Sequence, residues 1–392
     1  MKDVVILSGV RTPIGSFQGA LANFSGPQLG SFAIKAALEK AGVSGDQVDE
    51  VLMGCVLTGG LGQAPARQAA LGAGVPNGVP CTTINKVCGS GMKAAMMAAQ
   101  AIKLGDANVV LAGGFESMSN APYILEKART GYRMGNGTLI DMMIHDGLWD
   151  PYHNVHMGNC GDKTSAEFNF SREQLDAFAA ESYNRALAAQ TAGKFNDEIV
   201  PVAVPQRKGD PVMVSSDEEP GRGNVAKLPE LRPAFGKEGV TTAGNASSIN
   251  DGGAAMVLAS DEFASSNGLK PLGRIVAYAQ HAQEPEWFTT APAFAVQKLL
   301  SKAGLSVDQI DLFEVNEAFS VVAMIVAQKV GIPAEKLNVN GGAVAIGHPI
   351  GMTGARLILT ALHELKRRGG KYAICSPCIG GGEATAILIE AF

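Results

Sequence analysis

The sequence predicts an α/β protein made of two duplicated units, with mostly parallel sheets and one inserted loop domain. Residues 35–54 and 297–316 share eight identities over twenty aligned positions without a gap, which indicates an internal duplication. Strand-like and helix-like segments alternate in the same order in both halves, as in parallel sheets covered by helices on both faces. The 392 residues include 48 glycines and only 18% charged residues, which is typical of a compact chain with many tight turns.

Short β-branched runs predict the strands, and apolar residues at helical spacing predict the helices. In the first half we expect strands at 4–8, 48–53, 81–84 and 108–112, and helices at 27–41, 65–71 and 91–104. In the second half we expect strands at 274–277, 310–315, 337–339, 372–375 and 384–389, and helices at 293–303, 319–330 and 353–367.

Residues 119–249 have no counterpart in the other half and interrupt the alternation. We therefore expect three units: residues 1–118 together with 250–269, an inserted loop domain at 119–249, and residues 270–392. Within the insertion, Ser171 and Gln174 form a capping-box pattern ahead of an amphipathic helix at 172–189. This insertion is expected to cover a site and to contact a substrate or a partner subunit.

Charge and cysteine content exclude several classes of protein. Lys and Arg number 32 against 37 Asp and Glu, a net charge of −5, and no basic run is present, so neither nucleic acid nor an anionic membrane is an expected partner. The apolar run at 4–7 is far shorter than the roughly 7–15 residues of a signal peptide. Six sparse cysteines fit a reducing compartment, so we expect a cytoplasmic protein.

Chemistry in such folds gathers beyond the carboxyl ends of the strands. Cys88 follows the strand at 81–84 and lies at or just before the helix at 91–104. Unpaired N–H groups at a helix start favour a thiolate, the nucleophilic form of cysteine. A buried, inert cysteine is an equally good interpretation of this residue taken alone.

The duplicate half places His348 at the corresponding position, between a glycine and a proline. This placement favours a base or an electrophile, while the alternative is a structural histidine. Asn316 follows the strand at 310–315, where its side chain can hold a water or a carbonyl, or simply cap a helix.

Cys375 and Cys378 form a C-x-x-C pattern, but residues 380–382 are glycines and a strand follows, whereas a thioredoxin-like motif needs a helix there. Glycines let backbone N–H groups approach a reacting oxygen, so an oxyanion hole beside Cys378 is the better hypothesis. A zinc site is only weakly supported, and neither a Walker A nor a dinucleotide-binding motif occurs.

Six segments, in order along the whole chain, resemble the motifs of the thiolase family: residues 85–93, 113–119, 244–247, 316–319, 341–351 and 378–382. The resemblance implies two similar domains in a layered αβαβα body, with 119–249 as the loop domain, and a homotetramer built as a dimer of dimers. It also implies coenzyme A thioesters as substrates, no permanently bound cofactor and no metal.

Residue roles also follow from the resemblance. Cys88 would take the acyl group from an acyl-CoA, and His348 would activate Cys88. Cys378 would exchange a proton with the Cα of a second acyl-CoA. Asn316, through a water, and His348 would polarise one thioester oxygen, while the backbone N–H groups of Cys88 and Gly380 would hold the other. Claisen condensation needs these parts: a leaving thiol, a stabilised carbanion and cradles for two oxyanions.

Within the family, the short-chain type that acts on acetyl-CoA, acetoacetyl-CoA and CoA is the closer match. Matching substrate-binding positions are Leu148, His156, Met157, Phe235, Ala243, Ser247, Phe288, Ala318 and Phe319. Arg222 and Lys227 are candidates for the 3′-phosphate of CoA, although each is equally well a solvated charge. Ser248 and the pair Glu383-Ala384 depart from the common family pattern.

The expected activity is the reversible joining of two acetyl-CoA to acetoacetyl-CoA and CoA. A 3-ketoacyl-CoA thiolase of broader chain length in fatty acid metabolism is the near alternative. Ketosynthases of fatty-acid type share the fold, but their pattern of one Cys with two His is not matched at Cys378. A non-catalytic dithiol redox or scaffold protein is the alternative from another class, and it predicts no burst of free CoA.

Overall fold

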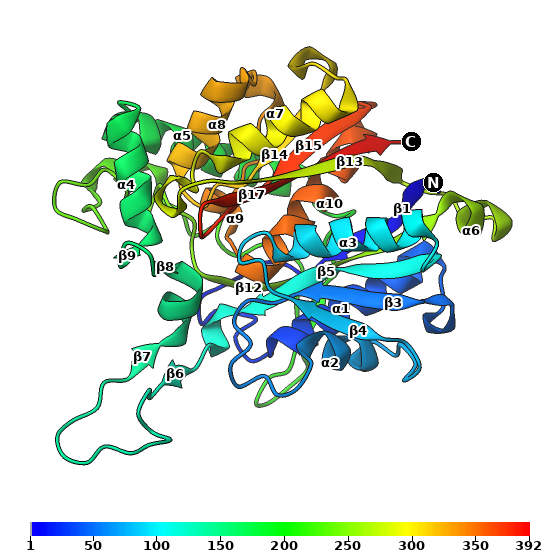
Figure 1. The fold of residues 1–392 in the computed structure, drawn as a ribbon, viewed down its shortest axis with the longest axis horizontal. Helices are drawn as coiled ribbons and strands as arrows, with labels where there is room; N and C mark the ends of the chain where they lie inside the picture. Colours follow the sequence, from blue (N-terminus) through cyan, green and yellow to red (C-terminus); the bar gives the residue numbers. More distant parts are fainter. Residues whose placement is uncertain (1) are drawn as a thin grey trace.

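Alternating layers of helices and strands build the chain, which confirms the predicted αβαβα body (Figure 1). The computed structural model describes residues 2–392. The helices of one outer layer are α1 (Gly26–Ala41) and α2 (Pro65–Gly72), those of the middle layer are α3 (Ser90–Leu104) and α10 (Ile350–Arg368), and those of the other outer layer are α7 (Ala291–Ala303) and α8 (Ser320–Val330). The layers therefore place α3 and α10 between the strands of the two halves.

One mixed sheet runs through both halves, in the order β14-β15-β17-β13-β1-β12-β5-β3-β4. Its first-half strands are β1 (Val4–Arg11), β3 (Glu50–Gly54), β4 (Cys81–Ile84), β5 (Val109–Ser117) and β12 (Asn250–Ser260), and its second-half strands are β13 (Gly273–Ala282), β14 (Leu312–Val315), β15 (Tyr372–Ser376) and β17 (Glu383–Ala391). Short strands β2 (Gly15–Ser16) and β16 (Cys378–Ile379) pair with β12 and β17. The ladder between β1 and β13 has two pairs, Val5 with Arg274 and Ile6 with Gly273, so the halves diverge from one end.

The expectation of mostly parallel sheets was wrong. Pairs β3–β4, β3–β5 and β14–β15 are parallel, whereas β12 lies antiparallel to β1 and β5, and β17 lies antiparallel to β13 and β15. No helix crosses over between β15 and β17, which are joined by a short turn, and a strand that returns without a crossover must run antiparallel.

The strand expected at 337–339 was also wrong. Residues Ala334–Lys336 form a short 3₁₀ turn, and Leu337 makes one isolated bridge with Phe313. Asn338 has φ +42°, and its side chain accepts a hydrogen bond from the backbone N–H of Val315 (2.9 Å) and donates one to the Val315 carbonyl (2.9 Å). This amide therefore satisfies the edge of β14 in place of a neighbouring strand.

The duplication is visible in matching local structure. Helices α1 and α7 both end at a left-handed glycine, Gly42 with φ 66° and ψ 28° and Gly304 with φ 66° and ψ 30°. Each is followed by a 3₁₀ turn that opens with the same capping box, Ser44–Gln47 and Ser306–Gln309, and then by a parallel strand. The residues that the two halves share are those that fix this helix, turn and strand.

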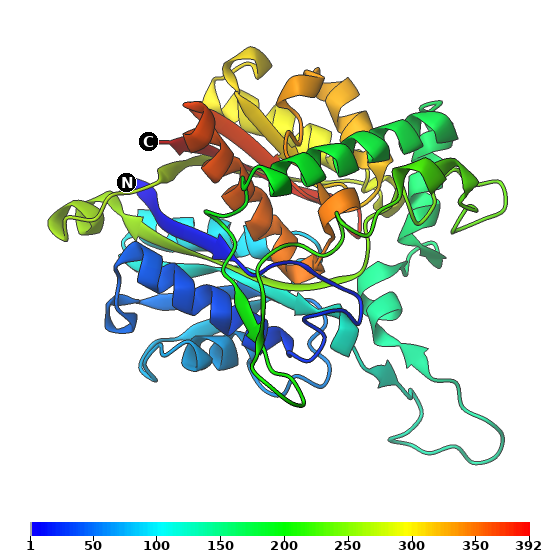
Figure 2. The ribbon, with the colours of Figure 1, turned by 180° about the vertical axis from the view of Figure 1, so that it is seen from behind.

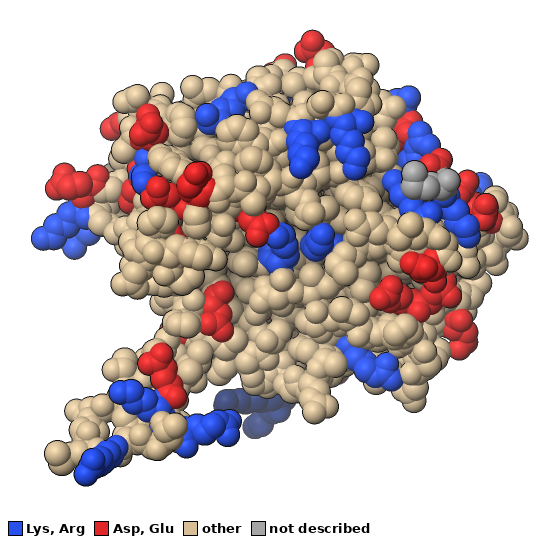
Figure 3. Space-filling view, in the orientation of Figure 1, with Lys and Arg blue, Asp and Glu red and all other residues tan. Residues whose placement is uncertain are grey.

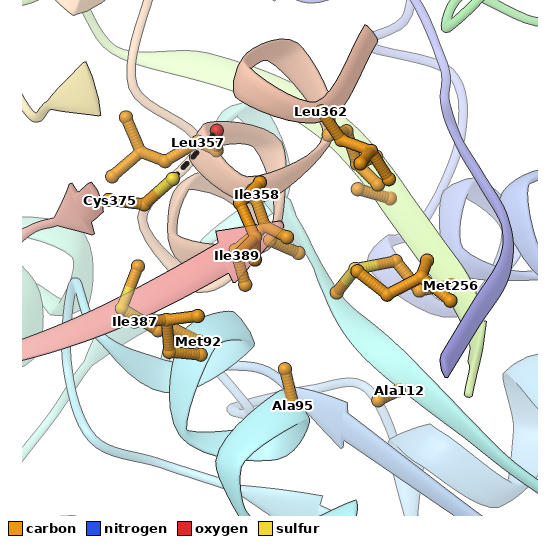
Figure 4. Packing of buried hydrophobic residues seen from close by; sticks show 14 of the residues in the cluster. Met92, Ala95, Ala112, Met256, Leu357, Ile358, Leu362, Cys375, Ile387 and Ile389 are labelled. Carbon is orange, nitrogen blue, oxygen red and sulfur yellow. Dashed lines mark hydrogen bonds between the residues drawn. The ribbon is translucent and has the colours of Figure 1, made fainter. Parts of the chain in front are cut away.

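The middle layer packs against both halves of the sheet. Met92 and Ala95 of α3 and Leu357 and Leu362 of α10 belong to one buried cluster with strand residues such as Ile387 (Figure 4). Cys375 lies in this cluster, where its Sγ is 3.3 Å from the Leu357 carbonyl oxygen. Burial raises the pKa of the Cys375 thiol well above its ordinary value. Cys375 is therefore a core residue, and the C-x-x-C pattern is not a pair of accessible thiols.

The insertion leaves the sheet after Ser117 and re-enters it at Asn250. Its elements are β6 (Tyr123–Ile124), β7 (Ile140–Asp141), a π-helical turn (Met143–Leu148), β8 (Trp149–Asp150), β9 (Val155–His156), α4 (Met157–Glu167), α5 (Arg172–Thr191), β10 (Val202–Val204), β11 (Val212–Val214) and a 3₁₀ segment (Val225–Glu230). The capping box predicted ahead of α5 is present at Ser171. The division of the chain into three units stays a prediction.

The segment between β6 and β7 extends away from the body (Figures 1 and 2). Lys and Arg side chains gather on this protruding segment, whereas elsewhere on the same face basic and acidic side chains are interspersed (Figure 3). Within residues 2–392, no helix is both long enough and apolar enough to cross a membrane.

Candidate active site

A cavity of about 350 Å³ lies where loops of both halves meet the insertion. Its lining includes these predicted residues: Cys88, Leu148, His156, Met157, Phe235, Ala243, Ser247, Phe288, Ala318, Phe319, His348 and Gly380. Further lining residues that the sequence did not indicate are Met118, Gly147, Ala234, Ala246, Ile249 and Ile350. The structure thus brings predicted residues from three distant parts of the chain to one place.

Four predicted residues do not line the cavity. Asn316 and Cys378 are fully buried. Asn316 lies beside His348, and Cys378 lies near enough to Cys88 for the charge of one thiolate to raise the pKa of the other thiol. Arg222 and Lys227 are exposed side chains outside the cavity lining. Their contact with a CoA phosphate stays a prediction.

Cys88 sits in a tight loop between β4 and α3. Val87 has a left-handed φ of 45°, and the Ser90 hydroxyl accepts a hydrogen bond from the Lys86 N–H (2.9 Å) and donates one to the Val87 carbonyl (2.6 Å). Burial raises the pKa of Cys88 to about 11, although the N–H groups of Gly380 and of Cys88 itself oppose this rise. Backbone N–H groups thus act in the expected direction, but burial outweighs them, so Cys88 needs a base to lose its proton.

His348 is held as a neutral base. Its Nδ1 lies 2.6 Å from the Thr353 hydroxyl, which itself donates to the Pro349 carbonyl (2.9 Å), so Nδ1–H donates to Thr353 and the lone pair is on Nε2. Burial, together with the positive charge of Arg356, lowers the pKa of His348 to about 3. An imidazole that is neutral at pH 7 can accept the thiol proton of Cys88.

Asn316 supplies a polar group to the same corner. Its Nδ2 lies 3.4 Å from His348 Nε2, and its backbone N–H donates to the Ser376 carbonyl (3.1 Å). Among the described residues, Asn316 Oδ1 has no hydrogen-bond partner. A buried amide oxygen left unpaired costs about 1–3 kcal/mol, so Asn316 is suited to accept a hydrogen bond from a group that enters the site.

Cys378 and Gly380 occupy a narrow hairpin between β16 and β17. Burial raises the pKa of the Cys378 thiol well above its ordinary value, and the nearby Cys88 raises it further. Gly381 and Gly382 have φ +91° and +84°, which side chains other than glycine rarely adopt. This turn aims the N–H of Gly380 toward the sulfur of Cys88.

Three supporting residues were missed by the sequence argument. Thr353 fixes the tautomer of His348, and the Asn250 side chain accepts a hydrogen bond from the His348 backbone N–H (2.8 Å). Glu116 accepts hydrogen bonds from the N–H groups of Val56 (3.0 Å), Leu57 (3.0 Å) and Gly351 (2.9 Å), and burial raises its pKa to about 7. Thr353 lies in the first helical turn after His348, which is the one signal that could have identified it.

Aromatic rings form the wall of the cavity. His156 stacks on Phe235 with ring centroids 4.5 Å apart, and Phe319 meets Phe235 and Phe288 edge to face at 6.0 and 6.3 Å. A Cβ on Gly158 would lie 2.1 Å from the Phe235 ring, so glycine is what lets this ring pack against the start of α4. Rings locked in this way leave a narrow apolar passage.

The residues that bear metal-binding groups are dispersed. Within residues 2–392, no three His, Cys, Asp or Glu side chains gather in a metal-binding cluster. The polar groups that the site presents are the two thiols, the imidazole, the amide and the backbone N–H groups.

Comparisons with known proteins give a consistent result. The family model "Thiolase, N-terminal domain" matches residues 4–262, and "Thiolase, C-terminal domain" matches residues 269–391. The chain is 53% identical to acetyl-CoA acetyltransferase 2 of Arabidopsis thaliana over 391 residues, which cover 99% of this chain and 97% of that protein. It is 52% identical to acetyl-CoA acetyltransferase of Cupriavidus necator over 391 residues, covering 100% of both. The crystal structure of Bacillus anthracis acetyl-CoA acetyltransferase matches with a TM-score of 0.97 at 42% identity, covering 100% of this chain and 99% of that one.

Proposed function

The chain belongs to the thiolase family, and from this premise we propose that it is an acetyl-CoA C-acetyltransferase. It joins two acetyl-CoA reversibly to acetoacetyl-CoA and CoA through an acetyl group on Cys88. One observation carries the proposal: a neutral thiol and a neutral imidazole, whose Nε2 lone pair has only the long 3.4 Å contact with the Asn316 amide, both line a mostly apolar cavity.

Acylation uses the pair Cys88 and His348. His348 Nε2 accepts the thiol proton, the sulfur attacks the thioester carbonyl, and the departing CoA thiolate takes the proton from the imidazolium. Negative charge develops on the former carbonyl oxygen, which the N–H groups of Cys88 and Gly380 stabilise. Backbone donors fixed in this way act without reorganisation during the reaction.

Condensation uses the second thiol. The thiolate of Cys378 removes a proton from the Cα of the second acetyl-CoA. Because burial raises the pKa of Cys378, this thiolate is a strong base once it forms. His348 and Asn316, the latter through a water, stabilise the enolate oxygen. The carbanion attacks acetyl-Cys88, and Cys88 leaves as a thiolate. His348, which takes the thiol proton of Cys378 at the start of this step, passes that proton to the Cys88 thiolate.

The aromatic side chains that line the cavity favour a substrate with a short acyl group. Phe235, Phe288 and Phe319 pack edge to face or stack on neighbours, so none can swing aside without losing contacts with the others. We therefore propose acetoacetyl-CoA, rather than a long 3-ketoacyl-CoA, as the substrate for cleavage.

The test compares thiolysis of acetoacetyl-CoA with thiolysis of a long-chain 3-ketoacyl-CoA, and measures CoA released on mixing with acetyl-CoA. We expect rapid cleavage of acetoacetyl-CoA, little cleavage of the long chain, and a burst of about one CoA per site. Equal turnover of both substrates would assign the chain to the broader 3-ketoacyl-CoA type. Absence of both turnover and a burst would favour a dithiol redox or scaffold role.

We infer that the chain works as a cytoplasmic homotetramer without a permanently bound cofactor. The protruding segment supports assembly, because Tyr123, Met134 and Leu139 expose 63%, 96% and 62% of their surface there. Apolar side chains grouped on an extended segment are typical of an interaction site. Light scattering on the intact chain, and on a variant with residues 126–138 replaced by a short Gly-Ser linker, should show a tetramer for the first and smaller species for the second. An unchanged tetramer would exclude this segment.

A further inference from the structure

An ion pair joins the two loops that carry the donors for the thioester oxygen. The ammonium of Lys86, two residues before Cys88, contacts the carboxylate of Glu383, the first residue of β17. Their side chains are 24% and 33% exposed, so the pair is partly shielded from water. The two residues are 297 positions apart in the chain, and their contact links the loop of Cys88 to the start of the strand that follows Gly380.

The same two loops touch directly beside the ion pair. A Cβ on Gly89 would lie 2.3 Å from Cδ1 of Ile379, and a Cβ on Gly380 would lie 3.6 Å from Cγ1 of Val87. Ile379 stands opposite Glu383 in the ladder between β16 and β17. The ion pair and these contacts therefore join the backbone segments on the two sides of the cavity.

The loop on the Cys88 side is strained. Val87 is β-branched and has φ 45°, a conformation that costs about 1–3 kcal/mol and persists only where its surroundings hold it. Ser90 holds Val87 from the helix side through its two hydrogen bonds. The contact with Glu383 fixes the Lys86 side chain on the opposite side. The N–H of Cys88 follows directly after this strained residue.

One further charged side chain, Lys93, lies close to the ion pair. Lys93 lies near both partners: its pKa is lowered by burial and then by Lys86, and the charge of Glu383 opposes that change. Lys93 itself donates to the Gln280 side chain at 3.4 Å, a weak contact. Glu383 thus faces two cations but forms its ion pair with Lys86, the one of the two that belongs to the Cys88 loop.

We propose that Lys86 and Glu383 are positioning residues that set the spacing between the N–H groups of Cys88 and Gly380. Neither side chain touches the acyl group. This role rests on the proposed function, because the spacing matters only if an oxyanion forms between those two donors. Placing two donors at a fixed separation raises the rate of acylation, since they bind the transition state more strongly than the ground state.

The test uses Glu383→Gln, Lys86→Met and the reversed pair Lys86→Glu with Glu383→Lys. For each, rapid-quench chromatography measures the rate of the CoA burst with saturating acetyl-CoA, and steady-state kinetics give KM. Loss of an exposed ion pair alone changes an equilibrium only a few-fold, whereas a 1 Å displacement of a group at the reacting centre lowers the rate about 10²-fold. We therefore expect each single variant to slow the burst at least about 5-fold. KM should stay unchanged within error, and the reversed pair should recover most of the rate.

Glu390→Gln is the matched control. Glu390 lies on the same strand β17 and pairs with Arg274 at 2.7 Å, far along the strand from the turn. We expect it to leave the burst rate unchanged. Lys86→Arg keeps the charge, so it should retain a burst rate near that of the wild type even if Lys86→Met folds poorly.

Single variants with the wild-type burst rate would overturn the positioning role. So would a reversed pair as slow as the singles, or a Glu390→Gln variant slowed equally. A wild-type protein that gives no burst contradicts the proposed function itself. A wild-type burst with unchanged variants contradicts only the role of Lys86 and Glu383.

Discussion

Gly381 and Gly382 offer a matched pair of substitutions in the turn that carries Gly380. Both have positive φ, +91° and +84°, so alanine at either costs about 1–2 kcal/mol of backbone strain. A Cβ on Gly381 would meet nothing within 4 Å. A Cβ on Gly382 would lie 2.3 Å from the Gln283 carbonyl oxygen and 2.8 Å from the Glu284 carbonyl. Because backbone atoms cannot swing aside, only Gly382→Ala must displace the turn.

The displacement acts on the Gly380 N–H. Losing one donor of an oxyanion hole lowers kcat by about 10²–10³-fold. We therefore predict a loss of about 10²-fold in the CoA burst rate for Gly382→Ala, and a loss of less than about 10-fold for Gly381→Ala. Rapid-quench chromatography measures both rates, and thermal unfolding should show the strain of positive φ in both variants and a further loss of stability in Gly382→Ala from the backbone clash. Equal losses of rate would refute the argument that the geometry of this turn positions Gly380.

Three further predictions follow from the site. Cys378→Ser should still acetylate Cys88 but lose deuterium uptake at the acetyl Cα, because a hydroxyl has too high a pKa to shuttle this proton; exchange near the wild-type rate would move that role to His348. Thr353→Val leaves the Nδ1–H of His348 buried and unpaired, so acylation should slow about 10–100-fold with calorimetric CoA binding unchanged, and an unchanged rate would contradict the tautomer assignment. The pKa of His348 is about 3 in the folded chain, against an ordinary value of 6.5. Protonation below pH 6.5 therefore favours the unfolded chain, so the free energy of unfolding falls as the pH drops, by at most about 1.4 kcal/mol per pH unit. The Tm of His348→Asn should therefore fall less than that of the wild type between pH 6.5 and 5, and equal falls would show that His348 is not buried in its neutral form.

Local sequence patterns predicted much of the fold. Residues 35–54 and 297–316 share the left-handed glycine and the Ser-to-Gln capping box, and these residues alone dictate how a helix ends and a strand begins. β12 was not among the predicted strands, and its direction depends on where the chain returns after a long insertion, which no local pattern indicates. The absence of a strand at 337–339 could not be predicted either, since Asn338 replaces a strand by hydrogen bonds to Val315, which is distant in sequence.

Candidate site residues were predictable where position along the chain matters, as for Cys88 and His348, which each lie just ahead of the corresponding helix, α3 or α10. The protonation state of Cys88 was not, because the helix start is a local feature, whereas burial arises from distant residues such as Met118, Met143 and Ile350. Asn250 and Glu116 act through contacts between elements, and ordinary residue types of this kind give no local signal. Thr353 is marked only by its place in the first helical turn after His348. Their roles appear only when the loops are seen packed together.

Acetylation of Cys88 is the central claim, and intact mass spectrometry with peptide mapping tests it most directly. After brief incubation with acetyl-CoA and acid quench, we predict one acetyl group per chain, located on the peptide that contains Cys88 and absent from Cys88→Ala. An acetyl group on Cys378 in the wild-type protein, or turnover without any acetylated cysteine, would contradict the account.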